Sequence, residues 1–285
     1  MRRVVDLMMA TNTTALTAES HFNLRRPPFE RDIPASALYV SSKTMELLSR
    51  LEYAAQRRKF VVVTGDVGVG KTSAIRMFTD KLDPARFHCV YIADSALKPR
   101  VFYWEVLSQI AEDEKPSFYR NEGKRKLLAH MRRMIDNSKI IPILIIDEAH
   151  LLSHDMLEET RFLLNNEMDS NNPMALFIIG QSELRAKLSK GVYEPITQRV
   201  DFRFRLEPLD RAQTLEYISS HMRYAGGDAS VFTDTAVDAV FSYSGGLPRK
   251  INKACSFALL YAAQHGKRAV DGADIVFIIE QELTW

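Results

Sequence analysis

The sequence has few cysteines, little net charge and no long hydrophobic run. Its 285 residues include only two cysteines, Cys89 and Cys255, both in apolar surroundings, so we expect neither a disulfide framework nor a cysteine metal cluster. The 38 Lys and Arg residues nearly balance 36 Asp and Glu residues, for a net charge of +2. This balance excludes a uniformly basic nucleic-acid coat protein but not a local basic patch. The longest apolar runs, such as residues 140–146, are far too short to span a membrane.

The first residues do not resemble a signal peptide, because Asp6 interrupts their apolar stretch and no convincing cleavage site follows. Residues 1–21 are predicted to form a flexible tail, since they are mostly polar, rich in Thr and Ala, and lack a sustained period. The whole chain is 46% hydrophobic and 26% charged, which is typical of a globular protein. We therefore expect a cytoplasmic globular protein with no membrane partner.

Short apolar runs alternate with amphipathic stretches of helical length over residues 42–208. Strands that are apolar throughout and separated by helices indicate an α/β fold, in which helices cover both faces of a parallel sheet. The predicted strands are Phe60–Thr64, His88–Ala93, Pro142–Asp147, Met174–Ile179 and Val200–Leu206. We assign residues 22–208 to this α/β domain.

The pattern changes after Pro208, where only helical periodicity remains. Asp210 and Thr233 stand where helix N-caps are expected, and Gly226-Gly227 and Gly245-Gly246 mark breaks between helices. Residues 209–285 are therefore predicted to form a small all-helical lid domain.

The phosphate-binding motif G-x-x-x-x-G-K-[ST] occurs directly after the first predicted strand. Its glycines let backbone N–H groups surround a phosphate at a helix N-terminus. Lys71 would bridge the β- and γ-phosphates, and the Thr72 hydroxyl would bind Mg²⁺. The alternative is a chance glycine-rich turn, which the flanking strand and helix disfavour. The predicted nucleotide-binding residues are Gly65, Asp66, Val67, Gly68, Val69, Gly70, Lys71, Thr72 and the following Ser73.

A second acidic motif follows the third predicted strand, where Ile143–Ile146 run into Asp147 and Glu148. Such a strand end opens onto a ligand crevice in α/β sheets. Asp147 would hold Mg²⁺, and Glu148 would orient and polarise the attacking water. Alone, this pattern would more simply be a strand ending in an acidic turn. The letters Asp-Glu-Ala-His also occur in a helicase family, but no other helicase motif is present.

Taken together, these motifs resemble those of AAA+ ATPases, and the similarity covers roughly residues 22–283. Within that superfamily the chain looks most like the ExeA/TniB/TnsC group, which includes transposition ATPases that select target DNA and ATPases associated with secretion systems. The residues that carry the resemblance are Pro28-Phe29, Gly65–Thr72, Leu144–His150, Ile179–Leu184, Gln198-Arg199, Leu206–Leu209 and Ser244–Asn252. The resemblance implies the P-loop NTPase fold with a helical lid, and ATP and Mg²⁺ as cofactors.

The resemblance also implies three further catalytic roles. Gln181 matches the polar sensor-1 position, with a plain strand cap as the alternative. Arg249 matches sensor 2, which contacts the γ-phosphate in the same subunit; the alternative is an ordinary helix arginine, although an arginine there opposes the helix dipole. Arg199 matches the arginine finger that reaches a neighbour's nucleotide. The alternative is that Arg203 and Arg205 form a solvated strand face with Asp201. Which of Arg199, Arg203 and Arg205 is the finger stays open.

Residues 115–139 are strongly basic within this nearly neutral chain, with eight Lys and Arg against Glu122 and Asp136. In the group resembled, loops from this part of the sheet grip the DNA backbone, which requires positive charge and no sequence code. The alternative is an ordinary solvated helix face on which Glu122 pairs with Lys126. The predicted DNA-binding residues are Lys98, Arg100, Lys124 and Arg125.

The sequence therefore favours an ATP-dependent regulator of DNA transposition. It would assemble as a ring or helical oligomer on double-stranded DNA and recruit a transposase and target-selection proteins. A secretion-system accessory ATPase and a DNA-replication loader remain as alternatives. Glu148 counts against a nucleotide switch that does not hydrolyse ATP.

Overall fold

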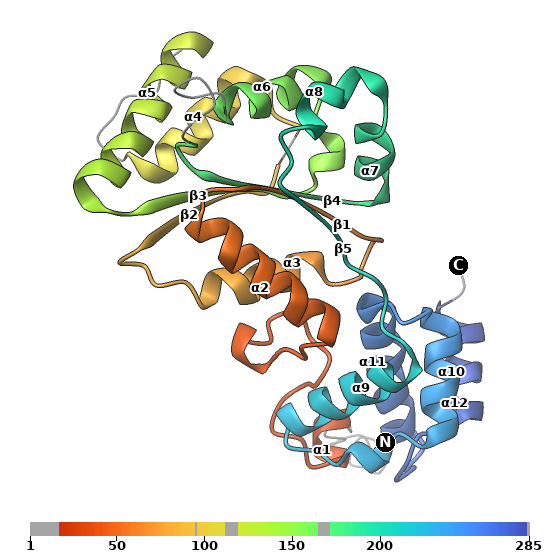
Figure 1. Ribbon diagram of the computed structural model, residues 1–285. Helices are drawn as coiled ribbons and strands as arrows, with labels where there is room; N and C mark the ends of the chain where they lie inside the picture. Colours follow the sequence, from red (N-terminus) through yellow and green to blue (C-terminus); the bar gives the residue numbers. More distant parts are fainter. Residues whose placement is uncertain (1–16, 95, 112–118, 165–171, 284–285) are drawn as a thin grey trace, which may run out of the picture. The chain divides into compact units, whose positions relative to one another are not determined.

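The computed structural model describes residues 17–94, 96–111, 119–164 and 172–283 (Figure 1). These residues form two compact units. An α/β unit comprises residues 40–207, and a helical unit combines residues 17–39 with residues 208–283.

The α/β unit is built on one sheet of five parallel strands, in the order β2-β3-β4-β1-β5. The strand bounds are Phe60–Thr64 (β1), Phe87–Ile92 (β2), Ile141–Ile146 (β3), Ala175–Gly180 (β4) and Phe202–Arg205 (β5). Every residue of β1 and β4 is buried, as expected for central strands covered on both faces. The order brings the ends of β1 and β3 close to the end of β4, which lies between them.

Helices cover both faces of this sheet (Figure 1). Helices α2 (Ser42–Gln56) and α3 (Lys71–Asp80) lie on one face. The other face carries α4 (Pro99–Ile110), α5 (Arg120–Arg133), α6 (His154–Leu164), α7 (Ser182–Leu188) and α8 (Glu194–Thr197). Shorter turns are η2 (Met134–Ser138), η3 (Ala149–Leu151) and η5 (Gly191–Tyr193). The predicted parallel sheet with helices on both faces is thus confirmed.

The helical unit contains four helices from the C-terminal part of the chain. These are α9 (Arg211–Tyr224), α10 (Asp234–Ser244), α11 (Pro248–Gln264) and α12 (Gly272–Ile278), with the turns η6 (Ala229–Val231) and η7 (Ile279–Leu283). Asp210 and Thr233 are N-caps, as predicted: the Asp210 side chain accepts the Gln213 N–H, and the Thr233 side chain accepts the Ala236 N–H.

Residues 22–39, which the sequence analysis grouped with the α/β domain, pack within the helical unit instead. They follow α1 (Ala18–His21) and include η1 (Ala35–Ala37). Leu24 and Phe29 are buried in the core formed by the C-terminal helices, and the Arg25 N–H donates to the Ala225 carbonyl at 2.8 Å. Residues 17–21, which were predicted to belong to a tail, directly precede this segment and belong to the same helical unit. Residues 1–16 lie outside the described part of the chain. No local pattern could indicate a hydrophobic partner almost 200 residues away.

Candidate nucleotide-binding site

The phosphate-binding motif forms the turn between β1 and α3. Gly70 is the N-cap of α3 at φ 102°, a conformation that a residue with a Cβ adopts only with strain. Lys71 is 7% exposed, and its Nζ donates to the carbonyls of Gly65 at 2.8 Å and Asp66 at 3.0 Å. The turn thus sets a lysine and the first N–H groups of a helix around one point, an arrangement suited to phosphate.

The Asp147 carboxylate lies at the end of β3, next to the phosphate-binding turn. Thr72 Oγ1 donates to its Oδ2 at 2.9 Å, and the Glu148 N–H donates to its Oδ1 at 2.8 Å. Both residues predicted to bind metal are therefore in contact. Mg²⁺ prefers oxygen ligands and usually keeps several waters, so a hydroxyl and a carboxylate beside a phosphate-binding turn fit a hydrated Mg²⁺.

Two residues around these carboxylates were not found by sequence reasoning. Tyr91 of β2 donates its hydroxyl to Asp147 Oδ2 at 2.7 Å. His150 Nδ1 lies 3.3 Å from Glu148 Oε2. Tyr91 is far upstream and carries no motif, whereas His150 is part of the Asp147–His150 tetrapeptide and could have been considered from its position.

Glu148 is held in a strained backbone conformation, with φ 49° at a residue other than glycine. Its Oε2 accepts from Gln181 Nε2 at 3.2 Å. Gln181 immediately follows β4, so the residue predicted as sensor 1 contacts the residue predicted to activate water. Ser182 then donates to Asp66 Oδ1 at 2.5 Å, which connects the start of α7 to the phosphate-binding turn.

Arg249 is exposed in the first turn of α11, in the helical unit. The turn before this helix is tight: a Cβ on Gly246 would lie 1.8 Å from the Leu209 carbonyl oxygen, and the Leu209 N–H donates to the Gly246 carbonyl at 2.9 Å. The segments Leu206–Leu209 and Ser244–Asn252, noted separately in the sequence, therefore meet here. The role of Arg249 toward nucleotide stays a prediction.

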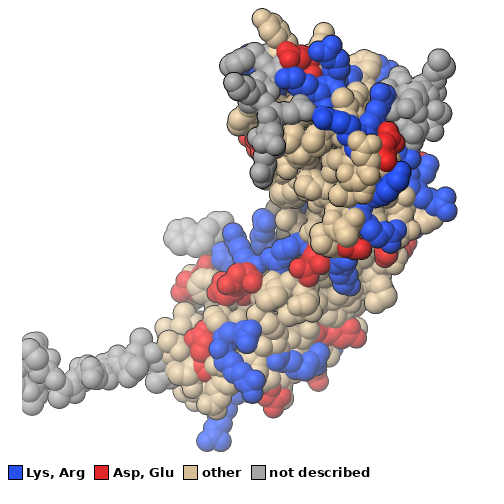
Figure 2. Space-filling model, turned by 90° about the vertical axis from the view of Figure 1, so that its left-hand side faces the viewer, with Lys and Arg blue, Asp and Glu red and all other residues tan. Residues whose placement is uncertain are grey.

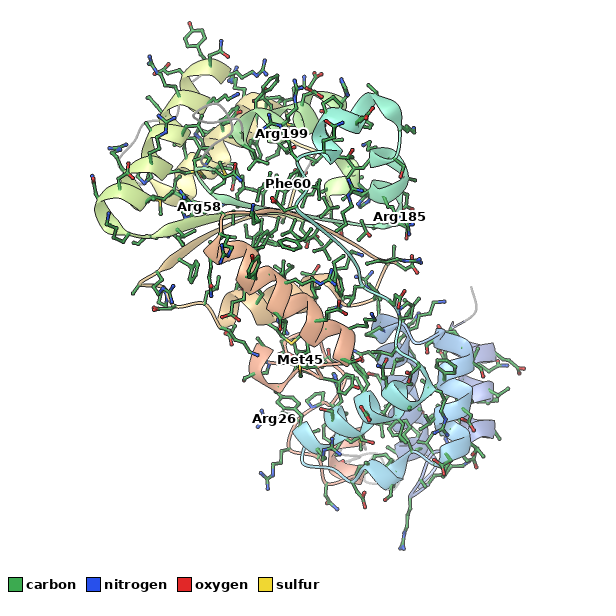
Figure 3. All side chains as sticks on the ribbon, viewed as in Figure 1. Arg26, Met45, Arg58, Phe60, Arg185 and Arg199 are labelled. Carbon is green, nitrogen blue, oxygen red and sulfur yellow. The ribbon has the colours of Figure 1, made fainter. Side chains whose placement is uncertain are left out.

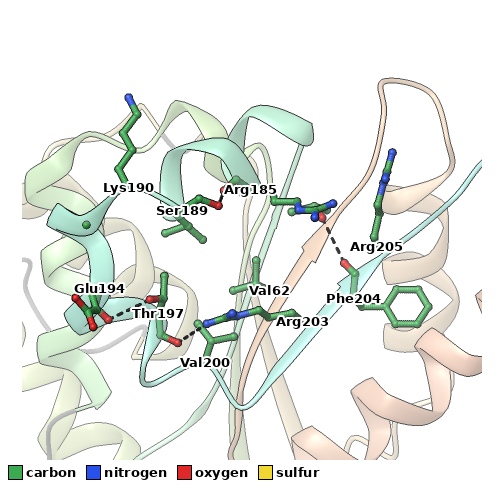
Figure 4. Close-up of a pocket in the computed structure, with 13 residues that line it drawn as sticks. Val62, Arg185, Ser189, Lys190, Glu194, Thr197, Val200, Arg203, Phe204 and Arg205 are labelled. Carbon is green, nitrogen blue, oxygen red and sulfur yellow. Dashed lines mark hydrogen bonds between the residues drawn. The ribbon is translucent and has the colours of Figure 1, made fainter.

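The three arginines considered for the finger differ in their surroundings. Arg199 follows α8 on the sheet face covered by α4–α8, and its side chain is half-buried (Figure 3). Arg203 and Arg205 of β5 line a pocket of about 590 Å³ between the sheet and α7 and α8 (Figure 4). Arg203 Nη2 donates to the Thr197 carbonyl at 2.7 Å, so this guanidinium is engaged within its own subunit.

Asp201 was considered as the acidic member of a solvated strand face. Instead, its carboxylate pairs with Lys59 at 2.8 Å and accepts the Phe60 N–H at 2.9 Å. This contact joins the start of β5 to the start of β1. The Asp201 carboxylate is thus paired with Lys59, whereas the strand-face alternative required its charge beside Arg203 and Arg205.

A second, smaller pocket of about 430 Å³ lies at the start of α4 and is lined partly by basic residues. It is lined by Lys98, Pro99, Arg100 and Arg120, together with the acidic Asp155 and Glu158 of α6. Lys98 and Arg100 are exposed, while Arg120 pairs with the fully buried Glu159, which also accepts the Tyr103 hydroxyl. Figure 2 shows the side of the α/β unit that lies at the left of Figure 1, with Lys and Arg side chains spread over it and acidic groups among them.

The remaining predicted DNA-binding residues lie on α5. Arg125 is exposed, but Lys124 places its Nζ over the Phe162 ring at 4.7 Å. Burial and the neighbouring Arg120 lower the pKa of Lys124. Lys126 pairs with Glu122 at 3.3 Å, which confirms the helix-face pairing considered as an alternative. Lys115, at the start of the basic segment, lies outside the described residues.

None of the helices in the described ranges is long and apolar enough to cross a membrane.

Comparisons with known proteins find a family model that matches part of the chain, a curated relative and solved structures with the same fold. A family model for an AAA domain matches residues 54–188. The general secretion pathway protein A of Aeromonas hydrophila is 30% identical over 274 residues, which cover 93% of this chain and 49% of that protein. The chain therefore spans about half the length of this curated relative.

Solved structures with lower identity share the fold. The Drosophila ORC bound to DNA aligns with a TM-score of 0.66 at 17% identity, over 97% of this chain and 68% of that one. Aeropyrum pernix ORC2 in its ADPNP-ADP complexes aligns at 0.63 and 12% identity, over 90% and 71%. The Thermotoga maritima RuvB branch migration motor aligns at 0.57 and 15% identity, over 90% and 73%. With its five-stranded parallel sheet, the turn formed by its phosphate-binding motif and its helical C-terminal region, this chain has a P-loop AAA+ fold.

Proposed function

We propose that this protein is a Mg²⁺-dependent ATPase that assembles on double-stranded DNA and regulates DNA transposition by recruiting or activating a transposase. The observation that carries the ATPase part is the set of contacts that joins Thr72, Asp147, Glu148 and Gln181, with Lys71 next to Thr72 in the same turn. These residues come from three separate strand ends, and they form one connected group at the edge where phosphate-binding sites occur in α/β sheets.

Each of these residues has a distinct chemical task in hydrolysis. Lys71 binds the phosphates, while Thr72 and Asp147 hold Mg²⁺, which would neutralise charge on the phosphates when bound. Glu148 orients the attacking water and accepts its proton, and Gln181 fixes the direction of the Glu148 carboxylate. Arg249 would add a positive charge from the same subunit, and Arg199 from a neighbouring one.

The DNA-binding part of the proposal rests on Lys98 and Arg100, which are exposed beside one another at the start of α4. Two exposed cations at the start of one helix suit phosphates of a DNA backbone. The nearby Asp155 and Glu158 reduce the net charge of this surface, so we expect moderate affinity that depends on salt. A shared fold with an ORC bound to DNA is consistent with this use of the surface.

We expect neutralising Lys98 and Arg100 together to weaken binding to all duplexes alike. The magnitude of the slope of log K against log[salt] should fall by about 1.8, because two phosphate contacts are lost. Fluorescence anisotropy at several salt concentrations, on two unrelated duplex sequences, would measure this. Arg125→Gln tests the other predicted DNA-binding surface, on α5; if only that variant changes the slope, the DNA surface lies on α5.

Two alternatives have their own support. The identity with the general secretion pathway protein A favours a secretion-system accessory ATPase, and the fold shared with ORC proteins favours a replication loader. The motifs at Ile179–Leu184, Leu206–Leu209 and Ser244–Asn252 resemble those of the ExeA/TniB/TnsC group, which includes both transposition and secretion-system ATPases. Within this group, the exposed basic residues Lys98 and Arg100 favour the transposition function. A neighbouring gene for an integrase-type transposase would favour the first function.

Electron microscopy with a non-hydrolysable ATP analogue, with and without duplex DNA, tests the proposal as a whole. We expect rings or helical assemblies that need both nucleotide and DNA, and an added transposase should bind to them. Assemblies that ignore DNA would contradict the DNA-binding part. DNA-bound assemblies that fail to retain the transposase would favour the replication alternative.

A further inference from the structure

Tyr91 connects the edge strand β2 to the carboxylate predicted to bind Mg²⁺. β2 pairs with β3 in parallel register, with Tyr91 opposite Ile145. The Asp147 N–H donates to the Ile92 carbonyl at 2.9 Å, so the chain around Asp147 is attached to the end of β2. From this position the Tyr91 hydroxyl reaches Asp147 Oδ2 at 2.7 Å.

The donors around Asp147 nearly saturate its carboxylate. A carboxylate offers about four acceptor positions, two on each oxygen. Tyr91 and Thr72 both donate to Oδ2, and the Glu148 N–H donates to Oδ1. Donors on both oxygens prevent the carboxylate from rotating, and one acceptor position remains on Oδ1.

The backbone of Tyr91 is also held in place. Gln109 of α4 accepts the Tyr91 N–H and donates to the Tyr91 carbonyl, each at 3.3 Å.

We propose that Tyr91 is a positioning residue for the Mg²⁺ ligand Asp147. By donating to Oδ2 beside Thr72, it fixes the orientation in which the Asp147 carboxylate would hold the metal. Gln109 supports it by fixing the strand from which it projects. This inference rests on the proposed Mg²⁺-dependent ATPase function.

The test compares Tyr91→Phe with the unmodified protein by the binding of a fluorescent, non-hydrolysable ATP analogue at increasing Mg²⁺. We expect the Mg²⁺ concentration for half-maximal binding to rise about tenfold, a typical effect of removing a partner of a metal ligand. Nucleotide affinity without Mg²⁺ should not change. Electron paramagnetic resonance of Mn²⁺ in place of Mg²⁺ would report the weakened metal directly.

Two further variants make the result specific. Gln109→Ala should shift the Mg²⁺ dependence in the same direction by a smaller factor, because Tyr91 is then held less firmly. Tyr53→Phe, on α2 and packed against Phe202, should leave it unchanged.

An unchanged or lower Mg²⁺ requirement in a folded Tyr91→Phe variant would overturn the inference. The proposed function fails differently: the unmodified protein itself would then bind no ATP analogue, or would bind it equally with and without Mg²⁺. The phenylalanine retains the ring, and thermal unfolding of the variant would verify that the fold is intact.

Discussion

The α/β unit and the helical unit differ in how much of their structure follows from short stretches of sequence. In the α/β unit, the residues that form the site follow directly after strands, so each short motif contains its own structural context. The helical unit instead joins two segments, residues 17–39 and 208–283, through a shared core. Short motifs in this sequence therefore predict the residues of the candidate site. They do not predict which distant segments share a hydrophobic core. The two units should accordingly respond to mutation in different ways.

The variant with the largest expected effect tests whether the candidate site of the α/β unit includes a residue from a neighbouring subunit. Arg199→Ala should bind ATP nearly normally but hydrolyse it ~10³–10⁵-fold more slowly, the range that arginine fingers contribute. Glu148→Gln should also be inactive, since the carboxylate that orients water is lost. Mixing the two variants should restore part of the activity, because an intact Glu148 can then face an intact Arg199 of a neighbour. A mixture that co-assembles but stays inactive would exclude Arg199 as the finger, leaving Arg205 and then Arg203.

A smaller loss of function should follow from Lys71→Ala. Removal of the ammonium that binds the phosphates should lower ATP affinity by roughly 10²-fold, equivalent to about 3 kcal/mol for a hydrogen bond to a charged group. Nucleotide-dependent assembly should then disappear. Isothermal titration calorimetry measures the affinity. Retained affinity would mean that the turn at Gly65–Thr72 is not the phosphate site.

In the helical unit, Phe29→Ala should lower the free energy of unfolding and leave ATP hydrolysis by the folded protein unchanged. Phe29 is 5% exposed, stacks on His221 with ring centroids 5.5 Å apart and meets Phe232 edge-on. Truncation of a buried Phe costs about 3 kcal/mol or more in the free energy of unfolding. Hydrogen exchange across α9 and α11 should accelerate accordingly. Met45→Ala is the control, because Met45 is exposed on α2 (Figure 3); equal effects of both variants would argue against the shared core.

The smallest effect concerns pH. Burial lowers the pKa of His221, whose Nδ1 contacts the Pro28 carbonyl at 2.8 Å. The unfolded chain therefore binds a proton more readily than the folded one. Stability should be complete above about pH 6.5 and fall by up to about 1.4 kcal/mol per pH unit below it, until the folded pKa is reached.

Urea unfolding at several pH values, followed by far-ultraviolet circular dichroism, would reveal this loss. His221→Asn keeps a donor for the Pro28 carbonyl but cannot titrate, so its stability should depend less on pH over that interval. If both proteins lose stability equally, a group other than His221 is responsible.

Most of the α/β unit was predictable because its strands are apolar throughout and end in recognisable residues. The predicted strand Phe60–Thr64 agrees with β1, and Asp147 and Gln181 both follow strands as expected. Side-chain direction was not predictable. Lys124 turns toward Phe162, and Tyr91 reaches Asp147, because these contacts depend on how neighbouring elements pack and leave no periodic signal.

The divided core of the helical unit also has a consequence during synthesis. Residues 40–207 are continuous, so the α/β unit can fold as soon as it leaves the ribosome. Leu24 and Phe29, in contrast, are made before this unit, and their partners on α9 and α11 are made after it. At 5–20 residues per second, these two side chains wait roughly 10 to 50 s for their core. During that interval they are exposed apolar groups on a nascent chain, and a chaperone that binds such groups would meet this protein there first.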